Sequence, residues 1–370
     1  MKRIIFVLSL LAGSIAIGWS TMSVDTTVQM DNELTITTNT NLANVNTLNN
    51  SRYGGAFYLY KADVMISGDL APDMFSNAIK GYLLIAGANV ANDGTAKGLF
   101  KNAYVDWIID PAFVYSFGII KNYFGTYQFG SGLPGALKDV NDQAYNTFNT
   151  AINSADFGMM ISGKLLPIEG FTKNLLCYNL EVENGEGYKT VFSGTSIAAD
   201  NYAYLANIGV QPVDGLTFGF SYRGENQSWT TSNTTTTFAV YATAKDVLGL
   251  PIDAFVDYTW QSWTNVYTSK VIADQANVLS VSAGYGFFDK KFTPYVRYDV
   301  STPTTNTAAS NQTSVFYVGA NIKPSPQLAI KPLFGYYFQN GVYTANKVNY
   351  PIYNDILIRL ELEYKMNFKI

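Results

Sequence analysis

Alternating side-chain polarity near the end of the chain constrains the fold more than any other feature. From Ile356 to Ile370 every even position is apolar, whereas the odd positions from Arg359 to Lys369 hold charged residues and one asparagine. Successive side chains of a β-strand point to opposite faces, so this segment predicts a strand with one apolar face and one charged face. Because a bilayer-crossing strand needs only about 9–11 residues, the segment suits either a membrane strand or an amphipathic strand of a soluble all-β protein.

The same alternation recurs along the chain and favours the membrane interpretation. Short turns are expected after Gly68, Ile109, Val210, Phe287 and Ile322, and longer polar loops at residues 39–51, 125–156, 183–200, 224–234, 262–274, 302–313 and 339–352. This asymmetry is typical of outer-membrane barrels, and an even number of strands lets the last strand pair with the first. We therefore predict an all-β fold, a transmembrane antiparallel β-barrel of about 16 strands, with short periplasmic turns and long extracellular loops.

Composition agrees with this prediction and excludes several other functions. Charged residues make up only 14% of the chain and aromatic residues 15%, which suits strands whose aromatic side chains form girdles at the membrane interfaces. The chain has no histidine, so Ser-His-Asp catalysis, Cys-His catalysis and histidine metal sites are excluded. Its single cysteine, Cys177, cannot form an internal disulfide. We expect no enzyme activity, no catalytic residues, no metal or other cofactor, and no nucleic-acid partner.

The first residues resemble an export signal. Lys2 and Arg3 precede an apolar run from Ile4 to Leu11, and small residues continue to Gly18. This arrangement predicts a signal peptide over residues 1–20 that is removed after export. The remaining residues, 21–370, are expected to form a single barrel domain in the bacterial outer membrane.

The longest interruption of the strand pattern runs from Gly125 to Asp156. It is rich in Gly, Asn and Asp and begins with Gly-Ser-Gly-Leu-Pro-Gly at residues 130–135. Loops longer than about 12–15 residues are usually functional or disordered. We expect this third loop to fold into the lumen and to bring Lys138, Asp139 and Asp142 to the narrowest part of a pore. The alternative is that the loop covers the extracellular mouth.

Three short segments carry a family resemblance. Residues 103–107 (Ala-Tyr-Val-Asp-Trp), 118–125 (Gly-Ile-Ile-Lys-Asn-Tyr-Phe-Gly) and 156–163 (Asp-Phe-Gly-Met-Met-Ile-Ser-Gly) resemble the phosphate-selective porin O/P-like family of sixteen-stranded bacterial porins. The resemblance covers roughly residues 53–190 and is only architectural afterwards. It implies a homotrimer whose third loop constricts the lumen. It does not imply phosphate as the solute, because residues 21–370 contain few arginines to line the pore.

In a membrane barrel, the face opposite the lipid-facing residues lines the pore. We expect Tyr298 and Leu362 to face lipid, and Arg297 and Glu363 to face the lumen. The pore-lining candidates are Lys61, Lys80, Asp106, Lys121, Lys138, Asp139, Asp142, Arg223, Arg297, Asp299, Lys331, Arg359, Glu361 and Glu363. Rings of one charge sign give strong ion selectivity, so this mixture predicts weak selectivity. For each charge the alternative is a salt bridge to a neighbouring strand.

These observations predict a porin that lets small hydrophilic solutes and ions diffuse passively through a water-filled channel. Its expected partners are the outer-membrane lipid, those solutes and ions, and two further copies of the chain. The alternative function is a structural or adhesive surface-exposed barrel without significant transport.

Overall fold

The computed structural model describes residues 21–39, 53–69, 78–86, 100–121, 123–126, 155–184, 202–227, 233–267, 270–304, 312–340, 343–345, 348–350 and 353–369. The expected signal segment, residues 1–20, lies outside these ranges. So do Lys138, Asp139 and Asp142 of the third loop. No helix in the described part of the chain is both long and apolar enough to cross a membrane.

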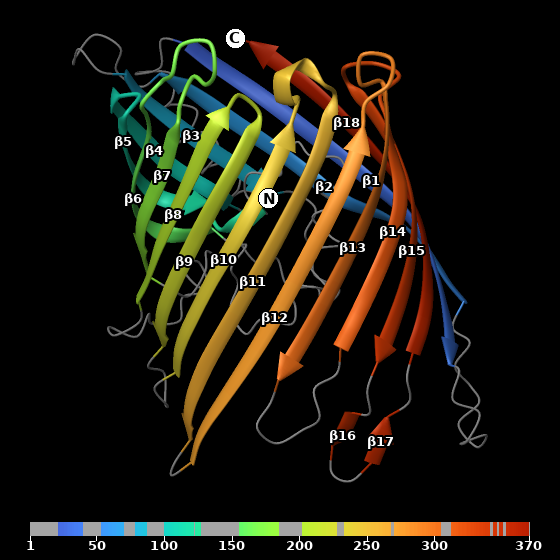
Figure 1. The fold of residues 1–370 in the computed structure, drawn as a ribbon. Coiled ribbons are helices and arrows are strands. Elements are labelled where there is room, and N and C mark those ends of the chain that lie inside the picture. Colours follow the sequence, from blue (N-terminus) through green and yellow to red (C-terminus); the bar gives the residue numbers. More distant parts are fainter. Residues whose placement is uncertain are drawn as a thin grey trace, which may run out of the picture.

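The described residues are almost entirely β-strand, so the predicted all-β antiparallel fold is confirmed (Figure 1). The strands are β1 (Thr21–Asn39), β2 (Tyr53–Asp69), β3 (Ala78–Ala86), β4 (Phe100–Asp110), β5 (Phe113–Lys121), β6 (Ala155–Leu165), β7 (Leu176–Glu183), β8 (Tyr202–Val213), β9 (Leu216–Gln227), β10 (Asn233–Lys245), β11 (Ile252–Tyr267), β12 (Lys270–Tyr285), β13 (Phe292–Thr304), β14 (Gln312–Ile322), β15 (Leu328–Asn340), β16 (Tyr343–Ala345), β17 (Val348–Tyr350) and β18 (Tyr353–Lys369).

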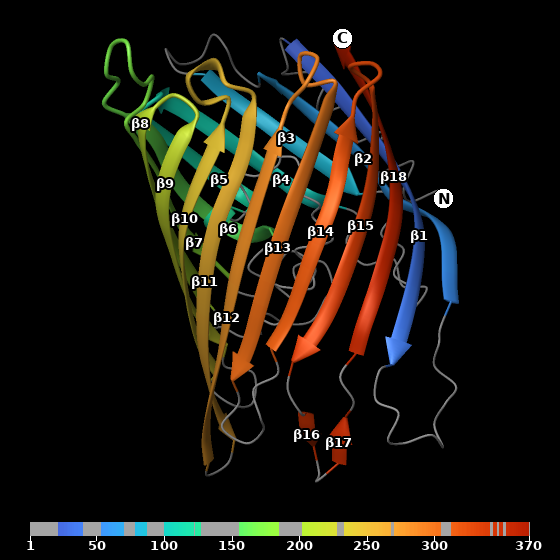
Figure 2. The ribbon, with the colours of Figure 1, turned by 45° about the vertical axis from the view of Figure 1, so that its right-hand side comes forward.

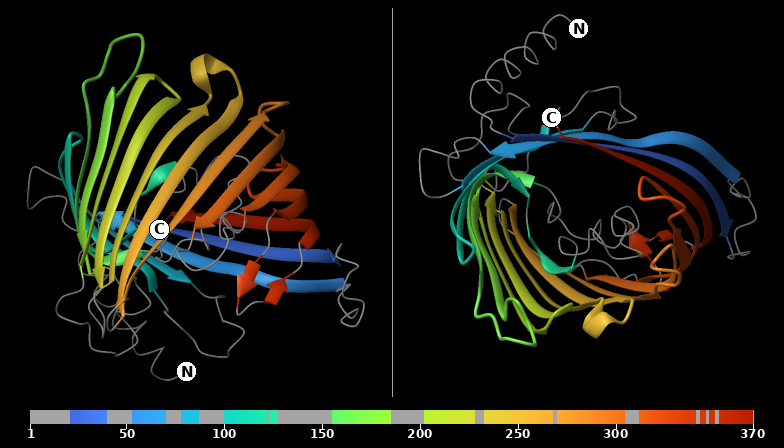
Figure 3. Two further views of the ribbon diagram at one scale, coloured as in Figure 1. Left: turned by 60° about the horizontal axis from the view of Figure 1, so that its bottom comes forward. Right: turned by 90° about the horizontal axis from the view of Figure 1, so that it is seen from above.

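One sheet contains all of these strands except β16 and β17, and it closes on itself. Its order is β1-β18-β15-β14-β13-β12-β11-β10-β9-β8-β7-β6-β5-β4-β3-β2, and each neighbouring pair is antiparallel. The first and last described strands meet at the β1–β18 pair, whose register runs from Ser23 opposite Lys369 to Asn39 opposite Tyr353. Seen from above, the strands follow one another around a ring (Figure 3). A second side view shows β13, β14, β15, β18 and β1 running side by side along the wall (Figure 2).

Side chains alternate between the two faces of this wall. In β8 every second residue from Ala203 to Gly209 is buried, whereas Tyr202, Tyr204 and Ile208 are exposed on the outside. The same alternation holds elsewhere: Tyr298 and Leu362 are 36% and 38% exposed, and their neighbours Arg297 and Glu363 only 1% and 9%. The faces expected from the sequence therefore agree with the register.

The strands extend further into the expected long loops than the sequence pattern predicted. β9 continues to Gln227 and β10 begins at Asn233, so most of the expected loop 224–234 is strand. The expected loops 262–274 and 302–313 are shortened in the same way, and β16 pairs with β17 as a hairpin inside the expected loop 339–352. Apolar alternation stops in these stretches, but threonine is β-branched and favours extended backbone without an apolar neighbour. Our loop boundaries were wrong for this reason.

The connections at the other end of the barrel are short. Pro111 and Ala112 alone separate β4 from β5, and Asp214 and Gly215 alone separate β8 from β9. Gly215 has φ +85°, the left-handed conformation that a two-residue turn of this kind requires. Short turns therefore join strands at one rim, as the sequence indicated.

Candidate functional site

The chain turns into the barrel directly after β5. We call residues Tyr123–Thr126 the inward segment. The backbone N–H of Tyr123 donates to Glu181 Oε1 on β7 (3.3 Å), and the N–H of Gly125 donates to Ser221 Oγ on β9 (2.9 Å). Both acceptors are buried side chains of the inner face. The segment therefore lies against the inner wall, and β5 ends just before it, at Lys121.

Asp257 of β11 holds the end of the inward segment. Its Oδ2 accepts hydrogen bonds from the backbone N–H (2.6 Å) and the hydroxyl (2.7 Å) of Thr126, and its Oδ1 accepts one from Thr259 (2.9 Å). Gly125 has φ +57°, and a Cβ at that position would lie 2.6 Å from Asp257 Oδ2. Only glycine combines this conformation with so close an approach to the carboxylate.

A buried network of neutral groups supports the same contact. Asn207 Oδ1 accepts hydrogen bonds from Ser221 Oγ (3.0 Å) and from the Tyr241 hydroxyl (2.8 Å). Ser221 in turn accepts the hydrogen bond from Gly125, so the inward segment is linked through three side chains to β8, β9 and β10. Our sequence analysis missed Asn207, Ser221 and Tyr241 because it considered only charged residues on the inner face.

Tyr123 contributes no charge to the wall at neutral pH. Burial, and after it the negative charge of Glu181, raises the pKa of the Tyr123 phenol to about 12. The inward segment therefore presents neutral groups to the carboxylates around it.

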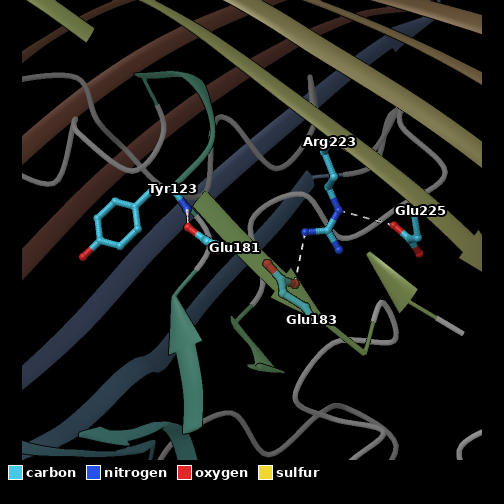
Figure 4. Close-up of polar contacts among 5 residues, drawn as sticks. All are labelled: Tyr123, Glu181, Glu183, Arg223 and Glu225. Carbon is cyan, nitrogen blue, oxygen red and sulfur yellow. Dashed lines mark hydrogen bonds and ion pairs between the residues drawn. The ribbon is translucent and has the colours of Figure 1, made fainter. Parts of the chain in front are cut away.

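Beside the inward segment lies an acid-rich cluster, formed by Glu181, Glu183, Arg223 and Glu225. Arg223 Nη1 lies 3.3 Å from Glu183 Oε2, and Arg223 Nε lies 3.4 Å from Glu225 Oε2 (Figure 4). All four residues are at most 5% exposed. Of these four residues the sequence analysis named Arg223 as a pore-lining candidate, and it assigned Glu183 and Glu225 to loops. The alternation of buried residues along β7 and β9 would have identified both.

A second group of charges lies on β13, β15 and β18. This balanced cluster contains Arg297, Asp299, Lys331, Arg359, Glu361 and Glu363, three basic and three acidic residues. Arg297 Nε donates to Asp299 Oδ1 (2.9 Å), and the Arg297 guanidinium lies over the Phe255 ring, 5.4 Å from its centroid. Lys331 forms ion pairs with both Glu361 and Glu363. Every residue of this cluster was a predicted pore-lining candidate.

The inner face is not uniformly polar. Tyr295, Val315, Tyr317 and Leu333 form a buried apolar group next to the balanced cluster. Period-two alternation separates two faces but does not say that one of them is wholly polar. Aromatic residues at odd positions of β13 and β14 were the available signal.

The remaining candidates are less buried or fall outside the described side chains. Lys80 and Asp106 are partly buried, and Asp106 accepts a 2.6 Å hydrogen bond from Ser116 on the neighbouring strand. Lys61 lies in β2 and Lys121 ends β5, but their side chains are outside the described part of the chain. The structure brings Arg223 together with Glu183 and Glu225, pairs Arg297 with Asp299, and pairs Lys331 with Glu361 and Glu363.

This closed antiparallel sheet is shared with solved structures of bacterial outer-membrane channels and porins. No known protein family and no curated protein sequence matches the chain. Among solved structures it is similar to the outer membrane channel DcaP of Acinetobacter baumannii, with a TM-score of 0.63 at 12% identity over 93% of this chain and 97% of that chain. An anion-selective porin from Comamonas acidovorans gives a TM-score of 0.60 at 10% identity, covering 93% and 99% of the two chains. OmpT, an outer membrane protein of Vibrio cholerae in a trimer form, gives 0.58 at 14% identity, covering 94% and 100%. At these identities the likeness establishes the fold.

Proposed function

We propose that the protein is an outer-membrane porin, a barrel of about 16 strands through which small hydrophilic solutes and ions diffuse passively. One observation carries the proposal above the others. The inward segment is hydrogen-bonded to β7, β9 and β11 on the inside of the closed sheet. A chain segment held at that place narrows the space that the barrel encloses, and a narrowed aqueous lumen is how porins select solutes by size.

The outer face of the sheet supports a membrane location. Large apolar side chains are exposed there on successive strands, including Phe218, Val240, Val256 and Leu279. Such a band would be unfavourable in water but is stabilised by lipid. Because the sheet is closed, no unpaired backbone edge meets the hydrocarbon. We therefore assign the protein to the bacterial outer membrane, after removal of residues 1–20.

The pairing of the inner arginines argues against phosphate as the solute. Arg223 is engaged by Glu183 and Glu225, and Arg297 by Asp299. A phosphate group would have to displace these carboxylates from both guanidinium groups. The proposal therefore keeps the general porin function and takes no solute from the phosphate-selective family.

The third loop and the oligomeric state complete the proposal. Because the inward segment is its beginning, we infer that the loop enters the lumen and that Lys138, Asp139 and Asp142 act on passing ions there. A homotrimer is proposed because the similar OmpT of Vibrio cholerae has a trimer form.

Single-channel recording in planar lipid bilayers tests the function. The purified full-length protein should produce discrete conductance steps in potassium chloride, and deletion of residues 131–150 should increase the step size because the constriction is removed. Protein inactivated by heating serves as the control. A folded protein that produces no conductance would instead support the structural or adhesive barrel.

A further inference from the structure

The acid-rich cluster carries unequal numbers of opposite charges. Glu181, Glu183 and Glu225 contribute three carboxylates, and Arg223 contributes one guanidinium. With all four groups ionised, the cluster has a net charge of −2, from three negative charges and one positive charge. The balanced cluster, with three groups of each sign, has a net charge of zero.

Two of these carboxyl groups lie close together without a donor between them. Glu181 and Glu183 are two residues apart on β7, so both point into the barrel, and their carboxyl groups are within hydrogen-bonding reach of each other. Glu181 Oε1 accepts from Tyr123 and Glu183 Oε2 pairs with Arg223. Glu181 Oε2 and Glu183 Oε1 are buried and accept no hydrogen bond from a donor among the residues that the structure describes.

Buried carboxylate oxygens without a partner are unfavourable, and two of them side by side also repel each other. A positive charge shared between them removes both costs. One shared proton would leave the cluster with a net charge of −1. A small inorganic cation can bind both oxygens at once, because carboxylate oxygens are the ligands that such hard cations prefer.

The described residues do not form a complete cage for such an ion. They contain no group of three or more histidine, cysteine or acidic side chains arranged to hold a metal. An ion between Glu181 and Glu183 would have only these two carboxyl groups as ligands among the described residues and would be bound weakly. Weak binding is what conduction requires, because an ion must both enter and leave its site.

We propose that Glu181 and Glu183 form a weak site for small inorganic cations on the inner wall and give the channel a preference for cations over anions. The inference rests on the proposed channel function. It makes these two glutamates the residues that determine charge specificity, at the place where the inward segment meets β7. The fold alone does not impose this preference, since the similar porin from Comamonas acidovorans is described as anion-selective.

Reversal potentials under a potassium chloride gradient test the proposal. For the wild-type protein we expect a permeability ratio of potassium over chloride above one, and calcium chloride added on one side should reduce the potassium current. In the double variant Glu181→Gln/Glu183→Gln the ratio should fall toward one and the calcium effect should disappear. Glutamine keeps the size and hydrogen-bonding capacity of glutamate, so the change removes mainly the charge.

The control is Glu169→Gln, the same change at an exposed turn residue, which should keep the wild-type ratio and the calcium effect. A wild-type ratio of one or below, or an unchanged ratio in the double variant, would overturn the proposal and leave a shared proton as the occupant. If the double variant does not fold, a wild-type ratio of one or below, or the absence of a calcium effect, still overturns the proposal. A protein without any conductance would refute the channel function itself, so the two failures are distinguishable.

Discussion

The acid-rich cluster and the balanced cluster occupy two parts of the same inner wall and treat buried charge differently. In the balanced cluster Lys331 reaches two glutamates and Arg297 has Asp299 beside it, so charges of opposite sign are matched. In the acid-rich cluster one arginine lies among three glutamates, and the backbone N–H of Tyr123 in the inward segment donates to one of them. The comparison teaches that charges of both signs on one inner wall can be matched in one part and unequal in another, so their local pairing has to be considered as well as their total.

The largest difference between the two clusters should appear when each loses a central cation. Arg223→Met leaves three buried carboxylates together. Removing one partner of a buried ion pair typically lowers the free energy of unfolding by about 3–5 kcal/mol. Lys331→Met should lower the free energy of unfolding by less, because the Lys331 side chain is 20% exposed and Lys365 also contacts Glu363. Urea unfolding of the two variants in detergent measures both losses. Equal losses would contradict the distinction between the clusters.

An arginine substitution on the outer face of the sheet should reduce the stability of the folded protein by a similar amount on β10 and on β14. Val240 on β10 and Val318 on β14 are 47% and 44% exposed on the outside of the barrel. An arginine on the lipid face near the midplane costs about 2–4 kcal/mol, so Val240→Arg and Val318→Arg should destabilise the folded protein to a similar extent. Unfolding from lipid vesicles measures this. A negligible loss in both variants would mean that this face does not meet lipid.

The third prediction concerns the anchor beside the acid-rich cluster. Asp257→Ala removes the acceptor of both Thr126 hydrogen bonds and should cost about 1–3 kcal/mol, because buried donors lose their partner. The inward segment should then be less fixed, and single-channel currents should fluctuate more. Glu169→Ala, at an exposed turn, is the control and should leave both stability and current noise unchanged. Quiet currents in the Asp257 variant would show that other contacts fix the segment.

The smallest effect is a difference between two glycines. Gly125 and Gly249 both have a left-handed backbone, with φ +57° and +81°, so alanine at either position should cost about 1–2 kcal/mol. A Cβ at Gly249 meets nothing within 4 Å, whereas one at Gly125 meets Asp257. Gly125→Ala should therefore destabilise the protein more than Gly249→Ala in the same unfolding assay. Equal losses would show that the carboxylate moves aside freely.

Strand periodicity explains what sequence reasoning predicted well. Arg297 and Tyr298, or Leu362 and Glu363, must point to opposite faces once the strand is recognised, because neighbouring side chains alternate. Strand ends were harder to predict. Glu225 was assigned to a loop because the apolar signal ends there, although hydrogen bonds to β8 and β10 continue the strand.

Contacts across the barrel could not be predicted at all. Thr126 and Asp257 are 131 residues apart, and no local pattern near either residue indicates that they meet. The same holds for Tyr123 and Glu181. Period-two alternation identifies which side chains face inwards, but the pairing among them depends on the curvature and register of the whole sheet.

The pairing of β1 with β18 has a kinetic consequence. β18 pairs with β1 on one side and with β15 on the other, so its 17 residues complete two interfaces at once. The pairs it forms with β1 join the segments that are furthest apart in the sequence, and contacts of long sequence separation form slowly. Until they form, the edge of β1 that β18 will occupy exposes backbone groups to any other strand, which is the condition under which β-proteins aggregate. A newly made chain therefore depends on protection of that edge until its last strand arrives.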